Sequence, residues 1–173
     1  LNNDTEVEPG FTDALVGTLE REATAFSAQA KLIQLHAPSK LDDAGNFYCA
    51  LGWAFARGKD KSSAYYEEQD EVFAACAGAA IYRKAVFEEI GYFDEAHFAY
   101  LEDIDIGWRA RIHGYRNLYV PQAKVLHAGS GTSGSRYNEF KVTLSSRNNI
   151  WIIYKNMPLL QLVMNLPFLM VGF

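Results

Sequence analysis

The stretch from residue 100 to residue 109 constrains the fold more than any other part of the sequence, because it joins acidic residues to a helical apolar pattern. Glu102, Asp103 and Asp105 fall within four positions. Apolar side chains recur at intervals of four residues, at Ile104, Trp108 and Ile112. This spacing predicts a helix packed on one face, and Gly114 is well placed to end it. We therefore expect the carboxylates at the helix N-terminus, pointing away from the core.

Two interpretations of these carboxylates are open on local grounds. In the first, they cap the helix and interact with its dipole, while Asp105 and Arg109 form an ordinary ion pair one turn apart. In the second, they belong to a functional site. A further acidic stretch at the start of the chain and a histidine after the helix favour the second interpretation.

Composition limits the class of protein. A length of 173 residues is enough for one domain with a packed core. The hydrophobic fraction of 49% and the aromatic fraction of 14% are typical of a globular protein. The formal net charge of -5 argues against a nucleic-acid-binding surface, which would need a basic stripe. A nucleotide ligand held through a metal ion is still compatible with this charge.

Two cysteines, Cys49 and Cys76, lie far apart in the sequence. They form neither a disulfide framework nor a zinc-binding spacing, so a reducing compartment such as the cytoplasm is expected. The chain begins at Leu1 without a methionine, inside an apparent motif. We expect further sequence upstream of it.

The first ten residues read as the end of a strand that runs into a loop, and Pro9 then opens a helix. Asp4 would lie in this strand-to-helix loop, at the carboxyl end of a strand. Ligands bind at that edge of open α/β sheets. The alternative is that Asp4 only forms a turn with its own backbone.

The middle of the chain alternates between short elements. Residues 31–35 read as a buried strand, and residues 42–71 as a long irregular loop of the kind that serves as a flap or binding loop. Residues 72–82 read as a strand interrupted at Gly78, where either a bulge forms or a ligand approaches closely. Residues 83–90 predict a short amphipathic helix.

Two short extended segments, 116–121 and 124–127, follow the acidic helix. His127 ends the second segment and precedes a glycine-rich stretch, 128–134, that predicts a flexible loop. A lone histidine is commonly a hydrogen-bonded structural residue. A histidine at a strand end beside a mobile loop is also a good candidate ligand, and both readings are open.

We divide the chain into residues 1–149, the main domain, and residues 150–173, an apolar C-terminal segment. The second part is rich in Leu, Ile, Val, Met and Phe but is broken by Pro158, Pro167 and several polar residues. These interruptions argue against a transmembrane span and favour a segment that lies at a membrane interface. The alternative is a pair of helices packed on another part of the protein.

Several motifs together resemble the family 2 glycosyltransferases of the GT-A fold, in their rhamnosyltransferase-like and galactofuranosyltransferase-like branch. The resemblance extends from Leu1 to about Asn156. It is carried by Asn2–Asp4 with a Pro-Gly helix start, Gly78–Ala79, residues 90–95, residues 100–105, Trp108–Arg109, Gly114–Tyr115, Pro121 and His127. It implies an α/β GT-A fold, of which this chain is the C-terminal portion.

The resemblance also implies roles on the donor side of a site. Asp4 matches the last acid of the family's metal-binding motif, and His127 matches a histidine that completes metal coordination. Asn2 stands where many members have the first acid, so it is expected to contact the donor. Gly78 and Ala79 match a substrate-binding pair. One carboxylate, one imidazole and phosphate oxygens suit Mn²⁺ or Mg²⁺, and shared ligation requires the Asp4 and His127 side chains within about 5 Å.

On the acceptor side, Asp103 matches the family's catalytic base, and Glu102 beside it would shape the sugar pocket. An inverting transfer needs one base to take the acceptor's proton. A glycosidase would instead need two carboxyl groups facing each other across the bond. Glu102 and Asp103 are adjacent in sequence and do not suit that arrangement.

The resemblance implies a metal-dependent inverting glycosyltransferase. Its donor would be a nucleotide-diphosphate sugar and its acceptor a glycan or a lipid-linked sugar. Its setting would be cell-surface polysaccharide synthesis at the cytoplasmic face of the plasma membrane, with this fragment alone expected to be inactive. Two other classes are open. One is a non-catalytic, membrane-peripheral module that binds carbohydrate or a partner, and the other is a metal-dependent nucleotidyltransferase.

Overall fold

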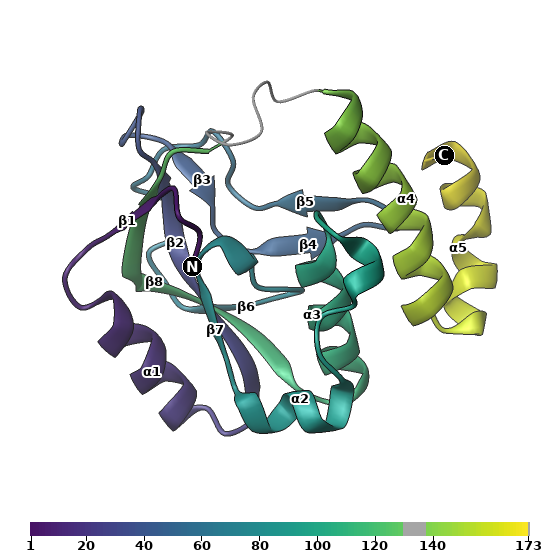
Figure 1. Ribbon diagram of the computed structural model, residues 1–173, viewed down its shortest axis with the longest axis horizontal. Helices are drawn as coiled ribbons and strands as arrows, with labels where there is room; N and C mark the ends of the chain where they lie inside the picture. Colours follow the sequence, from purple (N-terminus) through teal and green to yellow (C-terminus); the bar gives the residue numbers. More distant parts are fainter. Residues whose placement is uncertain (130–137, 173) are drawn as a thin grey trace.

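The computed structural model describes residues 1–129 and 138–172, and a mixed six-stranded sheet organises them (Figure 1). Its two long central strands, β2 and β8, run parallel, and the pairs that the shorter strands make with them are antiparallel. The strand order is β1-β8-β2-β3, and in addition β6 pairs with β8 and β7 pairs with β2. Strands β4 and β5 form a separate two-stranded sheet. The strands are β1 (Thr5–Val7), β2 (Ala25–Gln34), β3 (Leu41–Asp43), β4 (Asn46–Tyr48), β5 (Ala54–Ala56), β6 (Asp70–Val72), β7 (Ala80–Tyr82) and β8 (Arg116–His127).

Helices cover both faces of this sheet and extend to one side of it (Figure 1). They are α1 (Phe11–Arg21), α2 (Lys84–Ile90), α3 (Glu102–Ile112), α4 (Glu139–Asn156) and α5 (Leu159–Gly172), with short 3₁₀ turns η1 (Ala77–Ala79) and η2 (Glu95–His97). On one face, Leu15 and Leu19 of α1 pack on small residues of β2 such as Ala28 and Ala30. On the other face, α2 and α3 enclose Phe26.

Helix α3 approaches the chain segment before η1 closely because position 107 has no side chain. A Cβ atom on Gly107 would lie 2.5 Å from the Cβ of Ala74, which is too short for a non-bonded contact. Asn117 of β8 donates hydrogen bonds to the carbonyls of Gly107 and Phe73, at 3.1 and 2.7 Å. These contacts fix the acidic end of α3 relative to the sheet.

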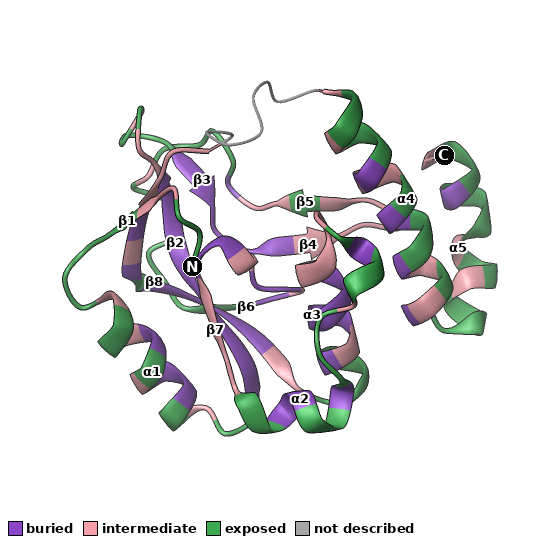
Figure 2. Cartoon of the chain, in the orientation of Figure 1, coloured by how far each residue is buried: buried purple, intermediate pink, exposed green. Residues whose placement is uncertain are grey.

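Helices α4 and α5 pack beside α3 and bury few of their apolar residues. Ile152, Met157 and Leu169 join Ile104 and Trp108 in one cluster. Most of α5 remains exposed (Figure 2), and Val171 and Leu160 are 80% and 73% accessible. No helix among residues 1–129 and 138–172 has both the length and the apolar character needed to cross a membrane. The expected boundary at residue 149 falls inside α4.

Several expectations about single elements were wrong. The first strand, β1, follows Asp4 instead of preceding it, because Thr5–Val7 pairs with the end of β8. The strand expected at residues 31–35 begins at Ala25 and is twice as long, since Ser27, Gln29 and Lys31 on it are buried but each has a polar partner. A pattern of hydrophobicity alone does not detect such a strand.

The long loop expected at residues 42–71 contains the end of β3, β4, β5 and the start of β6. The strand expected at residues 72–82 is instead the end of β6, the turn η1 and β7. The two segments at 116–127 are one strand, because β8 continues through Pro121 past a register shift against β2 between Ala30 and Lys31. Strands of three residues carry too little periodicity to be read from sequence.

The helix predicted from the acidic stretch is confirmed, from Glu102 to Ile112, but its faces differ from the prediction. Ile112 is 55% exposed. Asp105 is fully buried and does not point away from the core. Its carboxylate accepts hydrogen bonds from Arg109 at 3.0 Å, as predicted, and from Asn156 of α4 at 2.8 Å. Asp105 therefore joins α3 to α4, because a buried carboxylate requires such partners.

Candidate active site

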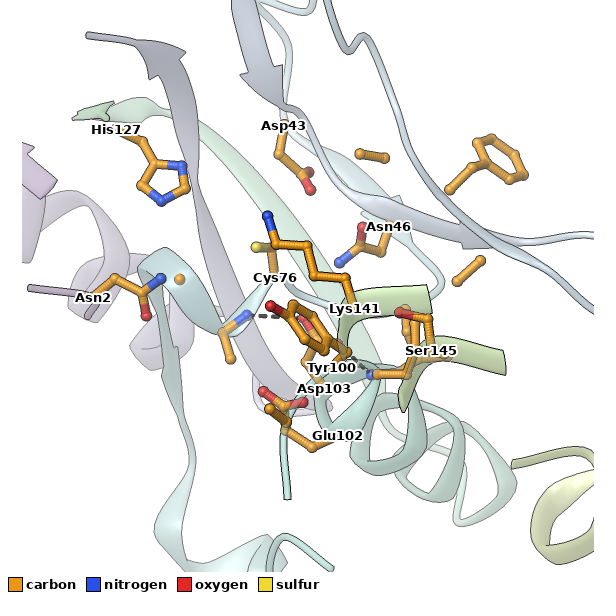
Figure 3. A pocket seen from close by; sticks show the side chains of 18 of the residues that line it. Asn2, Asp43, Asn46, Cys76, Tyr100, Glu102, Asp103, His127, Lys141 and Ser145 are labelled. Atoms are coloured by element: carbon orange, nitrogen blue, oxygen red, sulfur yellow. Dashed lines mark hydrogen bonds between the residues drawn. The ribbon is translucent and has the colours of Figure 1, made fainter. Parts of the chain in front are cut away.

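A cavity of about 680 Å³ lies where η1, the start of α3, the N-terminus and the end of β8 meet (Figure 3). It brings together six of the seven residues predicted from the sequence. They are Asn2, Asp4, Gly78, Glu102, Asp103 and His127. Ala79, the seventh, is fully buried in the core against α1 and does not line the cavity. Its small side chain leaves room for that packing.

An unusual turn directly precedes the acidic N-terminal end of α3. Phe98, Tyr100 and Leu101 all have positive φ angles, of 60°, 69° and 66°. Such angles cost free energy for residues with side chains and persist where neighbouring structure holds them. Asn148 of α4, which is 1% exposed, provides this support. Its side-chain nitrogen lies 3.1, 2.9 and 2.7 Å from the carbonyl oxygens of residues 97, 99 and 100.

Asp103 is half-buried, and both of its carboxylate oxygens accept backbone hydrogen bonds. The N–H of Ala77 in η1 donates to Oδ2 at 3.2 Å, and the N–H of Ile104 donates to Oδ1 at 2.8 Å. Burial, and then the neighbouring charge of Glu102, raise the pKa of Asp103 to about 7. A carboxyl with this pKa exchanges a proton readily at neutral pH, as a general base must.

Glu102 lines the same cavity. Its Oε2 atom is buried, and no group in the described part of the chain donates a hydrogen bond to it. A buried carboxylate oxygen without a donor is costly. A ligand hydroxyl in the cavity would supply the missing donor.

Asp4 and His127 lie side by side at the other end of the cavity. The register of β1 against β8 pairs Thr5 with His127, which brings the preceding residue, Asp4, next to the histidine ring. The distance from His127 Nε2 to Asp4 Oδ1 is 3.4 Å, within the predicted limit. The other ring nitrogen, Nδ1, lies 2.8 Å from Oδ2 of Asp42. The hydrogen bond to Asp42 raises the pKa of His127 above its ordinary value.

These two residues fit a divalent metal ion. An imidazole nitrogen and a carboxylate oxygen at this separation are suitable ligands for Mn²⁺ or Mg²⁺. The described residues contain no group of three or more His, Cys, Asp or Glu side chains arranged to hold a metal. Asp4 and His127 would therefore supply two ligands, and the diphosphate of a donor would have to supply others.

Asn2 and Gly78 are held together at the cavity wall. The N–H of Asn2 donates to the carbonyl of Gly78 at 2.9 Å. A Cβ atom on Gly78 would lie 3.5 Å from the Asn2 side chain, which is ordinary contact. The Asn2 side chain therefore does not require a glycine at position 78, which lines the cavity.

Several residues that line the cavity were not among the predicted site residues, including Asp43, Asn46 and Lys141. Asp43 ends β3 and is 5% exposed, and its Oδ1 accepts from Gln29 at 2.8 Å and from the Gly45 N–H at 2.6 Å. Burial raises the pKa of Asp43 to about 6. An Asp-Asp pair before Gly45 is a signal in the sequence, but the pattern of residues 42–71 predicts a loop there.

Part of the predicted surroundings lies outside the described residues. Of the glycine-rich stretch expected to form a flexible loop, only residues 128 and 129 are described. Among the described residues that follow this stretch, Lys141 and Ser145 of α4 line the cavity (Figure 3).

The sequence is similar to that of a curated glycosyltransferase. The N-acetylglucosaminyl-diphospho-decaprenol L-rhamnosyltransferase of Mycobacterium tuberculosis, in strains CDC 1551 / Oshkosh and ATCC 25618 / H37Rv, is 31% identical over 146 residues. The match covers 77% of this chain and 47% of the relative, so the chain spans about half the length of the curated relatives it matches. No protein-family model matches the chain.

The fold is also similar to that of a solved glycosyltransferase. The crystal structure of GalNAc-T7 with UDP, GalNAc and Mn²⁺ superimposes with a TM-score of 0.62 at 15% identity, covering 87% of this chain and 30% of that one. At this identity the similarity concerns the fold alone, and it confirms the expected GT-A architecture. By sequence similarity to the rhamnosyltransferase and by fold, the chain belongs with the family 2 glycosyltransferases of the GT-A fold.

Proposed function

We propose that the protein containing this chain is a metal-dependent, inverting glycosyltransferase that uses a nucleotide-diphosphate sugar. The observation that carries the proposal is one cavity lined by Asp103, whose pKa is raised to about 7, and by the adjacent pair Asp4 and His127. A base and a metal-binding pair are the two components that displacement of a diphosphate requires. Asp103 and the pair Asp4 and His127 line the same cavity and are proposed to fill these two roles.

In this proposal Asp103 accepts the proton of the acceptor hydroxyl while that oxygen bonds to the anomeric carbon of the donor sugar. The bond from that carbon to the diphosphate breaks in the same displacement, so the anomeric configuration inverts. Glu102 Oε2 accepts a hydrogen bond from a sugar hydroxyl and orients it. Asp4 and His127 would hold Mn²⁺ or Mg²⁺, which neutralises charge on the departing diphosphate when bound.

The acceptor is proposed to be a glycan or a lipid-linked sugar in cell-surface polysaccharide synthesis. Support comes from the name of the relative, an L-rhamnosyltransferase for N-acetylglucosaminyl-diphospho-decaprenol. Further support comes from the exposed apolar residues of α5, with Trp151 and Tyr154 on the neighbouring α4. Aromatic and apolar groups of this kind favour a membrane interface. We propose that the protein works at the cytoplasmic face of the plasma membrane.

A transfer assay on the full-length protein tests this proposal. It would offer a panel of nucleotide-diphosphate sugars, a diphosphate-linked polyprenyl sugar as acceptor, and Mn²⁺ or Mg²⁺. We expect sugar transfer that stops on chelation of the metal and resumes on its return, and a product of inverted configuration by NMR. Carbohydrate binding without transfer from any donor would favour the binding module. Release of pyrophosphate from a nucleoside triphosphate would favour a nucleotidyltransferase.

A further inference from the structure

We propose that Asp42 is a positioning residue that fixes the proton of neutral His127 on Nδ1, so that Nε2 presents its lone pair beside Asp4 to a divalent cation. The inference rests on the proposed metal-binding role of Asp4 and His127, and it does not depend on which sugar is transferred. Asp42 does not itself line the cavity. It would act entirely through the histidine.

The geometry around the imidazole ring is asymmetric. Asp42 Oδ2 lies 2.8 Å from Nδ1, a full hydrogen-bond distance, whereas Asp4 Oδ1 lies 3.4 Å from Nε2. Asp42 comes from β3, and β2 separates that strand from β8, so the contact reaches across one strand of the sheet. Asp42 is 9% exposed, so little water competes for its carboxylate.

A carboxylate can only accept hydrogen bonds, so the short contact with Asp42 requires the hydrogen on Nδ1. Nε2 of the neutral ring is then an acceptor that faces the acceptor oxygen of Asp4. Two acceptors at this distance repel each other unless a cation or a proton lies between them. Metal-binding histidines commonly have this arrangement, with a carboxylate behind the ring that fixes its tautomer.

Lys59 determines which oxygen of the Asp42 carboxylate is available to His127. Its ammonium group pairs with Oδ1, which leaves Oδ2 for the histidine. In Asp42→Asn the amide oxygen would turn to Lys59, because an ammonium group is donor-only. The amide nitrogen would then donate to Nδ1 and force the ring hydrogen onto Nε2. This isosteric change should therefore reverse the tautomer and obstruct the cation.

Nitrogen-15 NMR of the histidine rings tests the proposal directly in the full-length protein, at a pH where His127 is neutral, together with Mn²⁺ affinity measured by EPR. We expect the Nδ1–H tautomer in the wild type and the Nε2–H tautomer in Asp42→Asn. Loss of a group behind a metal-binding histidine typically weakens metal affinity about 10- to 100-fold, and we expect the same here. Asp60→Asn is the matched control, because Asp60 accepts from Gln34, whereas the carboxylates paired with His127 are those of Asp42 and Asp4.

A double variant separates this mechanism from general loss of structure. Adding Lys59→Met to Asp42→Asn removes the ammonium group, so the amide oxygen can return to Nδ1–H and restore the original tautomer and most of the Mn²⁺ affinity. An Nε2–H tautomer in the wild type, or unchanged Mn²⁺ affinity in Asp42→Asn, would overturn the proposal. Neither readout involves sugar transfer, so failure of the transferase proposal would be seen separately, in the transfer assay.

Discussion

Asp103 connects the proposed chemistry to folding stability. Its pKa is about 7 in the folded protein and 3.8 for an ordinary aspartate. Between these values the folded protein holds a proton that the unfolded chain has lost. The free energy of unfolding attributable to Asp103 therefore decreases as the pH rises from about 4 to about 7. The structure tolerates an ionised carboxylate there at some cost in stability.

This gives a first prediction. Asp103→Asn removes the penalty of ionisation, so the variant should gain stability relative to wild type at pH 8 and not at pH 4. The gain should be on the order of a few kcal/mol at most, since the side chain is only half-buried. Urea unfolding at both pH values measures it, with Glu20→Gln on the exposed side of α1 as a control. Equal loss of stability at both pH values would contradict the assigned burial penalty.

At the scale of residues, the sequence predicted those candidate site residues that belong to a local motif. Glu102 and Asp103 at a helix start, and His127 at a strand end, could be predicted because each lies beside a strong element boundary. Asp42 and Asp43 were not predicted, although they are adjacent and precede Gly45, because β3 has only three residues and its neighbourhood resembles a loop. Their importance depends on β2, which brings β3 into the sheet.

At the scale of elements, the turn before α3 is held by α4. Its residues with positive φ angles are fixed through three backbone carbonyls by the side chain of Asn148. Nothing in the sequence near Asn148 indicates this contact, which spans about fifty positions of the chain. The position of Asp103 in the cavity thus depends on a helix outside the sheet.

A second prediction follows for Asn148→Ala. Loss of the amide should leave buried carbonyls without a donor, at about 1–3 kcal/mol of folding stability. The turn should relax and displace Asp103, and a displacement of about 1 Å can reduce turnover by about 10²-fold. We expect kcat to fall with little change in donor affinity. Asn149→Ala is the matched control, because Asn149 is also buried but makes no hydrogen bond to the described turn. A similar effect in both variants would remove the specific role of Asn148.

Other elements were predicted to the extent that their periodicity was strong. Helix α2 buries Val86, Phe87 and Ile90, as its apolar spacing predicts, whereas α3 was predicted as a helix but with a different buried face. β2 was truncated in the prediction because its buried polar residues, including Gln29 and Lys31, look exposed in sequence. β8 was divided in two because Pro121 suggests an interruption. The partners that satisfy these residues come from distant segments, so only the tertiary structure reveals them.

At the scale of the whole molecule, the exposed apolar surface of α5 takes no part in the cavity. A third prediction is that deletion of residues 157–173 moves the full-length protein from the membrane fraction to the soluble fraction, because burial of apolar groups drives interfacial attachment. The deletion also removes Leu169 from the core. The paired substitutions Leu160→Glu and Val163→Glu avoid this, since both side chains are exposed. Unchanged membrane attachment in the paired variant would favour packing against another part of the protein.

Whether the whole molecule is an enzyme or a binding module is tested most directly at Asp103. In the full-length protein, Asp103→Asn keeps the shape of the side chain but removes the proton acceptor. We expect turnover to fall by at least about 10²- to 10⁴-fold, the usual contribution of a general base. Donor affinity should hardly change, because Asp4 and His127 are proposed to bind the metal and diphosphate. The decisive measurement pairs turnover with donor affinity for this variant. Near-normal turnover, or loss of donor affinity, would contradict the assignment of Asp103 as the base.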